Sequence, residues 1–303
     1  METKSMGDDR HRAGAWALLT AIAPIAWGTT YFVTREFLPD GYPFYGALIR
    51  ALPAGILLLI LARRRPRGSW WWKSVVLGVL NMGAFFVLVY VAAQLLPTSI
   101  ASTVMAAGPV AMMLLAWGLL GARPRAAQAV AALIGILGVA LLLLTGTQAV
   151  NGLGVAASVS ALIMSSLGYV LAKKWSSDVD ALSSTAWQLI AAGVILAPVA
   201  VVTEGLPPAM DATTWLAYGY ISIVGTAVAF VAWFTGLRHL GAGTVGLIGL
   251  LNPVTGVLLG TLLAGEFLTL RQAVGVLVIL CGVLLGQPIF SGALIRVRAW
   301  MRA

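Results

Sequence analysis

Ten apolar runs, each about as long as a transmembrane helix, occupy most of the 303-residue sequence. A helix needs roughly 20 apolar residues to cross the hydrocarbon core of a bilayer. The runs cover approximately residues 16–38, 43–62, 72–95, 97–120, 126–145, 152–175, 182–203, 213–237, 242–263 and 270–290. Strands that span a bilayer alternate in polarity with a period of two over about ten residues, and none of the runs does so. The sequence therefore predicts an all-α integral membrane protein with ten transmembrane helices.

Composition supports this class and argues against a basic soluble protein. Only 10% of the residues are charged, whereas soluble domains carry about 25%. The net charge of +9 would favour a nucleic-acid partner if the chain were soluble. Here the basic residues lie in the connections between apolar runs, where the preference of cytoplasmic loops for Lys and Arg accounts for them. We therefore expect a lipid bilayer, and no nucleic acid, as a partner.

The same basic residues predict the orientation in the membrane. With the N-terminus in the cytoplasm, all of the 19 Lys and Arg residues except Arg35, Arg50 and Arg271 fall in cytoplasmic loops or tails. Ten spans return the chain to the side where it started, so both termini are expected in the cytoplasm. The single cysteine, Cys281, lies inside an apolar run, which predicts no intramolecular disulfide and no cysteine metal cluster. No cofactor is expected.

An internal repeat divides the chain. Residues 90–141 align without a gap on residues 234–285, and the shared register matches Pro109 with Pro253 and Gly121 with Gly265. Chance matching of apolar residues is the alternative explanation. Earlier in each half the similarity fades to pairs at another offset, such as Tyr31 with Tyr169 and Gly55 with Gly193.

The repeat predicts two units, residues 1–150 and 151–303, with five helices each. A five-helix unit enters the membrane on one side and leaves on the other, so its duplicate must be inverted. Inverted repeats are typical of alternating-access transporters, in which helix breakers in matching positions mark a midplane substrate site. Gly108-Pro109 and Asn252-Pro253, near the middle of the fourth and ninth runs, are the expected breaks.

Several short segments carry a family resemblance. They are Trp27-Gly28, the Arg-Ala-Leu-Pro-Ala stretch that begins at Arg50, Pro109, Pro253 and the segment 265–275. In these the chain resembles the drug/metabolite transporter superfamily, specifically the ten-helix proteins with two EamA-type repeats, and most of all amino-acid exporters of the YddG type. The resemblance implies export across the bacterial inner membrane. It also implies a central cavity lined by every span except the fifth and tenth. Residues 121–125 lack the glutamate and threonine of the matching segment in the second half.

Charged residues inside the apolar runs are candidates for function because a charge in hydrocarbon is costly. Arg50 could hold a substrate carboxylate through two parallel hydrogen bonds. It could instead snorkel to the interface or bind carbonyls at a helix end. Glu266 at the outer end of the ninth run could act as a gate or protonation site, or could pair with Arg271. No carboxylate lies in the middle of a run, so a proton relay through Asp or Glu is not expected.

The predicted substrate-binding residues are polar or aromatic residues within the spans: Trp27, Tyr31, Arg50, Asn81, Tyr90, Tyr169, Trp187 and Asn252. A buried amide such as that of Asn81 or Asn252 needs several hydrogen-bond partners. For the Ser and Thr residues of the spans, such as Thr30, Ser102 and Ser165, helix packing is the favoured role. Together these side chains would line an aromatic, nearly uncharged cavity that suits small zwitterions such as neutral amino acids.

Three other functions compete with an amino-acid exporter. The chain could export lipophilic drugs or another metabolite, or it could be a channel or a lipid scramblase. An enzyme is disfavoured, because there are only two histidines, His11 and His239, and no GxSxG or HExxH motif. A single chain can hold the whole transport pathway, so a monomer suffices.

Overall fold

The computed structural model describes residues 2–96, 104, 105, 107–143, 151–176, 178–263 and 269–285, and within them every regular element is a helix. The elements are α1 (Glu2–Phe37), α2 (Pro43–Ala62), α3 (Trp70–Gly78), η1 (Val79–Gly83), α4 (Ala84–Leu95), α6 (Gly108–Leu120), α7 (Ala126–Leu143), α8 (Gly152–Trp175), α9 (Ala181–Glu204), α10 (Ala212–Ser222), η2 (Ile223–Val228), α11 (Ala229–His239), α12 (Ala242–Ile248), α13 (Leu251–Leu263) and α14 (Leu270–Leu285). Each of the ten predicted apolar runs overlaps at least one of them.

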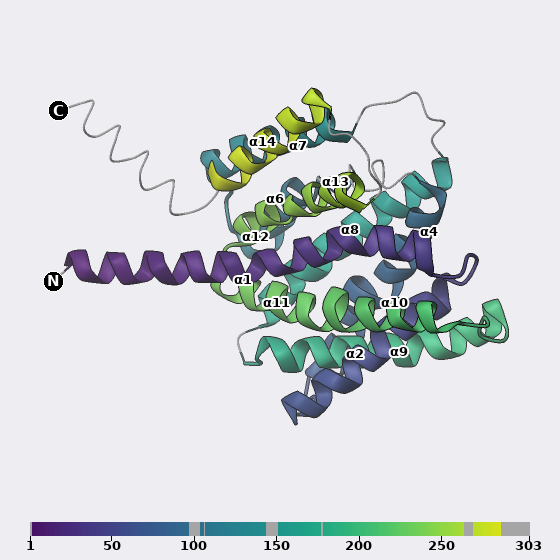
Figure 1. Ribbon diagram of the computed structural model, residues 1–303. Coiled ribbons are helices and arrows are strands. Elements are labelled where there is room, and N and C mark those ends of the chain that lie inside the picture. Colours follow the sequence, from purple (N-terminus) through teal and green to yellow (C-terminus); the bar gives the residue numbers. More distant parts are fainter. Residues whose placement is uncertain are drawn as a thin grey trace, which may run out of the picture.

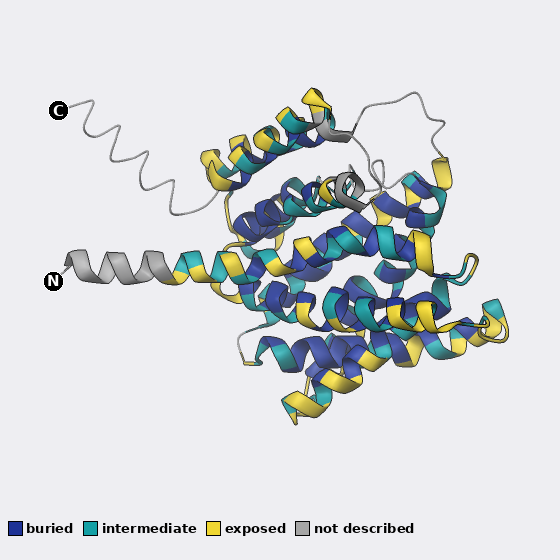
Figure 2. Ribbon diagram, in the orientation of Figure 1, coloured by how far each residue is buried: buried dark blue, intermediate teal, exposed yellow. Residues whose placement is uncertain are grey.

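Six helical segments are long and apolar enough to cross a membrane: Arg12–Phe37, Pro43–Ala62, Trp70–Leu95, Gly152–Trp175, Ala181–Glu204 and Ala212–His239. The helices of the fourth, fifth, ninth and tenth runs are shorter within the described residues. Large apolar side chains cover the outside of the bundle, and Leu18 and Val202 are 76% and 84% exposed. Figure 2 shows this contrast between a buried interior and an exposed outer surface. It is the pattern expected of helices that face lipid.

Two π-helical segments interrupt the long third and eighth helices. In a π-helix each bond spans one residue more than in an α-helix, and such segments are rare and frequently functional. η1 separates α3 from α4, and η2 separates α10 from α11. They begin at Val79 and Ile223, which are 144 positions apart. The aligned repeat has the same spacing, since residue 90 matches residue 234. The two interruptions therefore extend the repeat upstream of the aligned residues.

Helix breaks occur at the predicted prolines. α6 begins at Gly108, and Pro109 lies in its first turn, where a missing backbone N–H is tolerated. In the second half α12 ends at Ile248 and α13 begins at Leu251, so that Pro253 also lies in a first turn. The fourth and ninth apolar runs thus each contain a helix start close to the middle of the run.

Two pairs of helices pack through reciprocal glycine contacts. A Cβ atom on Gly138 of α7 would lie 2.8 Å from the backbone nitrogen of Ile279, and one on Gly282 of α14 would lie 3.0 Å from that of Gly135. Gly135 and Ile279 are equivalent positions of the aligned repeat, as are Gly138 and Gly282. Such an exchange of roles is the signature of a two-fold relation.

The second pair, α2 and α9, behaves in the same way. A Cβ atom on Gly55 would lie 2.9 Å from the backbone nitrogen of Ile190, and one on Gly193 would lie 2.8 Å from Cδ1 of Leu52, the residue equivalent to Ile190. Figure 1 shows α7 beside α14 at one side of the bundle and α2 beside α9 at the other. The remaining helices lie between these two pairs and enclose the centre of the molecule.

Candidate functional site

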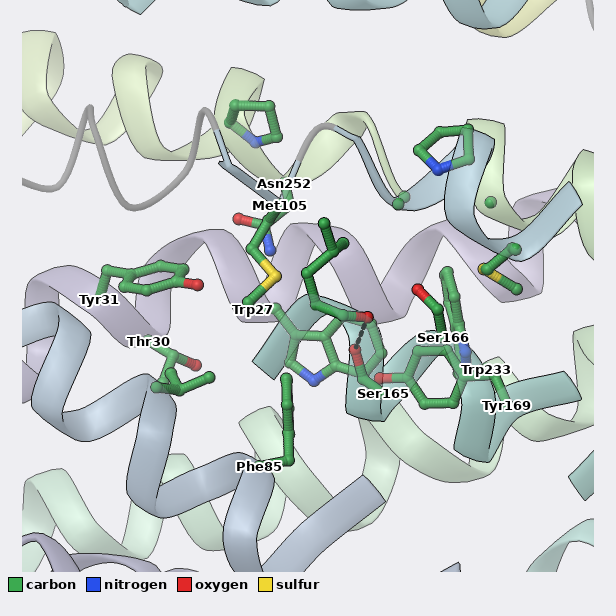
Figure 3. A pocket seen from close by; sticks show the side chains of 18 of the residues that line it. Trp27, Thr30, Tyr31, Phe85, Met105, Ser165, Ser166, Tyr169, Trp233 and Asn252 are labelled. Atoms are coloured by element: carbon green, nitrogen blue, oxygen red, sulfur yellow. Dashed lines mark hydrogen bonds between the residues drawn. The ribbon is translucent and has the colours of Figure 1, made fainter. Parts of the chain in front are cut away.

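A cavity lies at the centre of the bundle, among α1, α4, α6, α8 and α11 and beside the break between α12 and α13. Its volume, counted as the space open to the centres of water molecules, is about 90 Å³. One water needs about 10–15 Å³ on this measure, so the cavity has room for a small molecule. Figure 3 shows aromatic side chains on several sides of it, Trp27, Tyr31, Phe85, Tyr169 and Trp233 among them.

The aromatic rings hold one another in place. The ring centroid of Trp233 lies 5.0 Å from that of Trp27 and 5.4 Å from that of Tyr169, both in tilted geometry. The indole Nε1 of Trp27 donates a hydrogen bond of 3.1 Å to the carbonyl of Gly225, a residue of η2. The π-helical segment thus orients a side chain of the cavity wall.

Arg50 contributes a positive charge to this wall although it is only 7% exposed. Its Nε donates to Oγ1 of Thr226 at 2.8 Å, and its Nη2 donates to the carbonyl of Gly225 at 3.1 Å. The guanidinium carbon also lies 4.0 Å from the ring centroid of Phe86. No carboxylate among the described residues lies within ion-pair distance of Arg50.

These contacts agree with the expectation that Arg50 binds carbonyls, while its contact with a substrate carboxylate stays a prediction. It binds backbone oxygen, in a π-helical segment rather than at a helix end, and it also faces the cavity. The same side chain lines a smaller hollow bounded by Thr34, Gly46 and Tyr90. Arg50 thus stands between the central cavity and a second hollow.

Two further polar groups of the wall have no hydrogen-bond partner among the described residues. They are Oδ1 of Asn252 and Nε1 of Trp233, and both atoms are buried. Most buried polar atoms in folded proteins are paired, so an unpaired one needs an explanation. One acceptor and one donor, unpaired on the wall of the same cavity, are suited to binding a polar ligand.

The wall is built from equivalent positions of the two halves. In the 144-residue register of the aligned repeat, the wall residues Val89, Met105, Gly108 and Pro109 correspond to Trp233, Gly249, Asn252 and Pro253, which also line the cavity. In the 138-residue register that relates Tyr31 to Tyr169, the wall residue Trp27 corresponds to the wall residue Ser165. The cavity therefore lies where the two halves meet.

Three of the predicted substrate-binding residues lie elsewhere. Asn81 donates through Nδ2 to Oε1 of Gln188 at 2.8 Å, in a buried contact between η1 and α9. The hydroxyl of Tyr90 donates to the carbonyl of Pro39. Trp187 donates through Nε1 to the carbonyl of Arg64 at 2.8 Å, and so holds a loop. Each of these side chains has a protein partner that the sequence does not reveal.

The proposed gate pair is only partly described. Arg271 is exposed near the start of α14. Glu266 lies outside the described residues, so its pairing with Arg271 stays a prediction.

Three residues of the cavity wall, Phe85, Met105 and Ser166, are not identified by the sequence, because nothing distinguishes them from packing residues. The repeat register offers one signal for Met105: it is equivalent to Gly249, which lies between the helices that meet at the predicted break.

Comparisons with known proteins agree on one family. The model of the EamA-like transporter family matches residues 14–144 and again residues 152–286. Protein PecM of Dickeya dadantii is 39% identical over 269 residues, which cover 88% of this chain and 90% of that protein. The uncharacterized inner membrane transporter YedA of Escherichia coli is 30% identical over 264 residues, covering 84% of this chain and 85% of that protein.

A solved crystal structure shows the same fold. It superposes with a TM-score of 0.75 at 20% sequence identity, and the match covers 90% of this chain and 97% of the other.

Proposed function

Because the chain belongs to the EamA-like transporter family, we propose that it exports neutral amino acids, aromatic ones in particular, or similar small metabolites by alternating access of its central cavity. As a member of this family the chain is a multi-pass transporter of the bacterial inner membrane and not an enzyme. In the proposed arrangement residues 1–150 and 151–303 form two inverted five-helix repeats. The protein then has ten spans, with both termini in the cytoplasm, and binds substrate near the bilayer midplane between its halves.

The observation that carries the proposal is the buried charge of Arg50 on an aromatic cavity wall, with no carboxylate of the described part of the chain beside it. A buried cation without a counter-charge is strongly unfavourable in a folded protein. A substrate carboxylate would supply the missing charge and accept hydrogen bonds from the guanidinium. Oδ1 of Asn252 could accept from the ammonium group of the same zwitterion, and the rings around Trp27 and Trp233 would receive an apolar side chain.

Equivalent wall positions support alternating access in particular. If the two halves rock against each other, a wall drawn from both of them can present the substrate first to one side and then to the other. The helix starts whose first turns contain Pro109 and Pro253 lie beside the cavity, as the broken helices of transporters do.

The test compares a substrate with and without its carboxylate. Purified protein is reconstituted into proteoliposomes, and uptake of radiolabelled tryptophan and of tryptamine is measured with and without a pH gradient. We expect saturable tryptophan uptake that does not need the gradient, and poor uptake of tryptamine. The variant Arg50→Gln should reduce kcat/KM for tryptophan on the order of a hundredfold, because it removes the counter-charge of the carboxylate.

Arg35→Gln is the matched control, because Arg35 is an exposed arginine in the last turn of α1. It should transport as the unmodified protein does. Uptake of tryptophan and tryptamine at equal rates, unaffected by Arg50→Gln, would contradict the carboxylate site and favour export of lipophilic compounds. Uptake that rises linearly with concentration would instead indicate a channel.

A further inference from the structure

A third hollow, which shares no lining residue with the central cavity or with the hollow beside Tyr90, is lined by basic side chains. It lies between the loop of residues 63–69, the start of α3 and residues 178–180, and its volume on the same measure is about 1010 Å³. Its basic residues are Arg63, Arg64, Arg65, Arg67 and Lys73, and this group is called the basic hollow below. We propose that the basic hollow binds the phosphate headgroup of an anionic phospholipid.

The charge of the basic hollow is not balanced by its own acids. Asp178 and Asp180 also line it, against five basic residues. Arg64 and Asp180 form an ion pair with a nitrogen–oxygen distance of 3.4 Å, but their side chains are 70% and 44% exposed. An exposed pair of this kind contributes little and leaves most of the positive charge available. A phosphodiester is the anion that several arginines bind well, since each can donate two hydrogen bonds to it.

The backbone that carries these side chains is anchored. The carbonyl of Arg64 accepts the hydrogen bond of Trp187, and the backbone N–H of Trp70 donates to the carbonyl of Arg67 at 3.1 Å. Arg63 ends α2 in the left-handed conformation, with φ of 50°, while its own N–H still donates to Leu59. The guanidinium groups are therefore presented by an ordered loop, which lowers the entropy cost of gathering them around one ligand.

The neighbouring surface indicates a lipid rather than a soluble anion. Ile60 and Leu61 in the last turn of α2 are 63% and 60% exposed, and Trp71 and Trp72 at the start of α3 are 63% and 53% exposed. Exposed tryptophans at the end of an apolar helix are typical of the membrane interface. A ligand here would place its charge in the basic hollow and its chains along this apolar surface.

Lys73 joins the two parts of the site. Its Nζ lies 5.6, 5.9 and 5.7 Å from the ring centroids of Trp70, Trp72 and Trp175. The ammonium group is thus held at the level of the indole rings, where a phospholipid carries its phosphate. Basic clusters directly beside a transmembrane helix attract anionic headgroups.

Native mass spectrometry of the full chain tests the proposal. The protein is titrated in detergent with dioleoylphosphatidylglycerol and, separately, with dioleoylphosphatidylcholine, which has the same chains but no net charge. We expect a clear preference for phosphatidylglycerol. The double variant Arg65→Gln/Arg67→Gln should weaken that binding on the order of tenfold, and should leave binding of phosphatidylcholine unchanged.

The matched control is Arg123→Gln/Arg125→Gln, which removes the same charge from another loop on the same predicted side of the membrane. It should retain the preference. An equal loss in both double variants, or equal binding of the two lipids, would overturn the proposal. Displacement of bound lipid by an equal concentration of glycerol 3-phosphate would show that the ligand is a soluble phosphate instead. Thermal stability of each variant is measured alongside, so that a folding defect is recognised.

Discussion

Asp180 stabilises the start of α9 with both oxygens of its carboxylate. Oδ1 accepts the backbone N–H of Ser183 at 2.8 Å, and Oδ2 accepts the Ser183 hydroxyl at 2.8 Å. Loss of such an N-cap costs typically about 1 kcal/mol. We expect Asp180→Ala to lower the apparent midpoint of thermal unfolding in detergent by roughly a few degrees. Asp178→Ala, an exposed neighbour, should leave the midpoint unchanged; equal midpoints for the two variants would mean that the cap contributes nothing.

The cap also predicts a pH dependence. Burial alone would raise the pKa of Asp180, but hydrogen bonds from Ser183, together with the charge of Arg64, hold that pKa below its usual value. A carboxyl whose pKa is lowered by folding stabilises the protein above its unfolded pKa, which is about 3.9. That contribution is lost as the pH falls through the folded pKa. The difference between the unmodified protein and Asp180→Ala should therefore be constant from about pH 5 to 8 and shrink below about pH 4.

At the scale of helices, the close packing of α7 against α14 can be tested by alanine substitutions at their reciprocal glycines. A Cβ atom on Gly138 would meet the nitrogen of Ile279 at 2.8 Å and the carbonyl oxygen of Gly275 at 3.0 Å. Backbone atoms cannot move aside as a flexible side chain can, so Gly138→Ala should destabilise the protein by about 1–3 kcal/mol. Gly282→Ala should do the same, because it occupies the equivalent position.

Gly118 provides the control for this prediction. It lies in α6 with nothing within 4 Å of an added Cβ atom. Gly118→Ala should therefore be neutral or stabilise by up to about 1 kcal/mol, since alanine has the higher helix propensity. Apparent unfolding midpoints of the three variants decide the matter. We expect Gly138→Ala to lower the midpoint and Gly118→Ala to leave it unchanged or raise it. Equal effects of the two substitutions would show that α7 and α14 do not approach this closely.

Helix positions follow from the sequence more directly than helix irregularities. The predicted bounds of α2 and α8 agree with the structure, because a proline, a capping asparagine and charged loops stand beside the apolar residues. The π-helical segments η1 and η2 have no such local signal. In η2 the hydroxyl of Thr226 donates to the carbonyl of Ile221 and accepts from Arg50, a residue 176 positions away. The geometry of η2 therefore depends on a contact that the sequence alone does not show.

For the cavity, too, local sequence identifies some residues, whereas the role of others depends on contacts between helices. Trp27, Tyr31, Arg50, Tyr169 and Asn252 line it, as expected for aromatic and polar residues in mid-span. Asn81, Tyr90 and Trp187 have the same chemical character but donate hydrogen bonds to protein groups instead. Oδ1 of Asn81 has no partner among the described residues, although it does not line the cavity. Residue type predicts that a buried polar group has a partner, but only the packing of helices decides whether that partner is protein or ligand.

For the whole molecule, several side-chain contacts gather at one end of the bundle, around the end of α11. Lys173 of α8 donates through Nζ to the carbonyls of Leu237 and Leu240, and Arg238 donates to the carbonyl of Val179. The ring of His239 stacks on that of Trp16 in α1, with centroids 3.8 Å apart. Under the proposed topology this is the cytoplasmic end. If alternating access opens this end to the cytoplasm, we expect these contacts to separate.

Covalent linkage across this end should therefore stop transport. We expect Trp16→Cys/His239→Cys, in a Cys281→Ser background, to lose tryptophan uptake in proteoliposomes after treatment with a short, reducible bis-thiol reagent, and to regain it on reduction. Each single cysteine variant, treated identically, controls for modification of one helix alone. Alternating access requires α1 and α11 to part in every cycle, whereas a permanent pore requires no such motion. Undiminished uptake by protein that electrophoresis or intact-mass analysis shows to be fully cross-linked would therefore contradict alternation at this end.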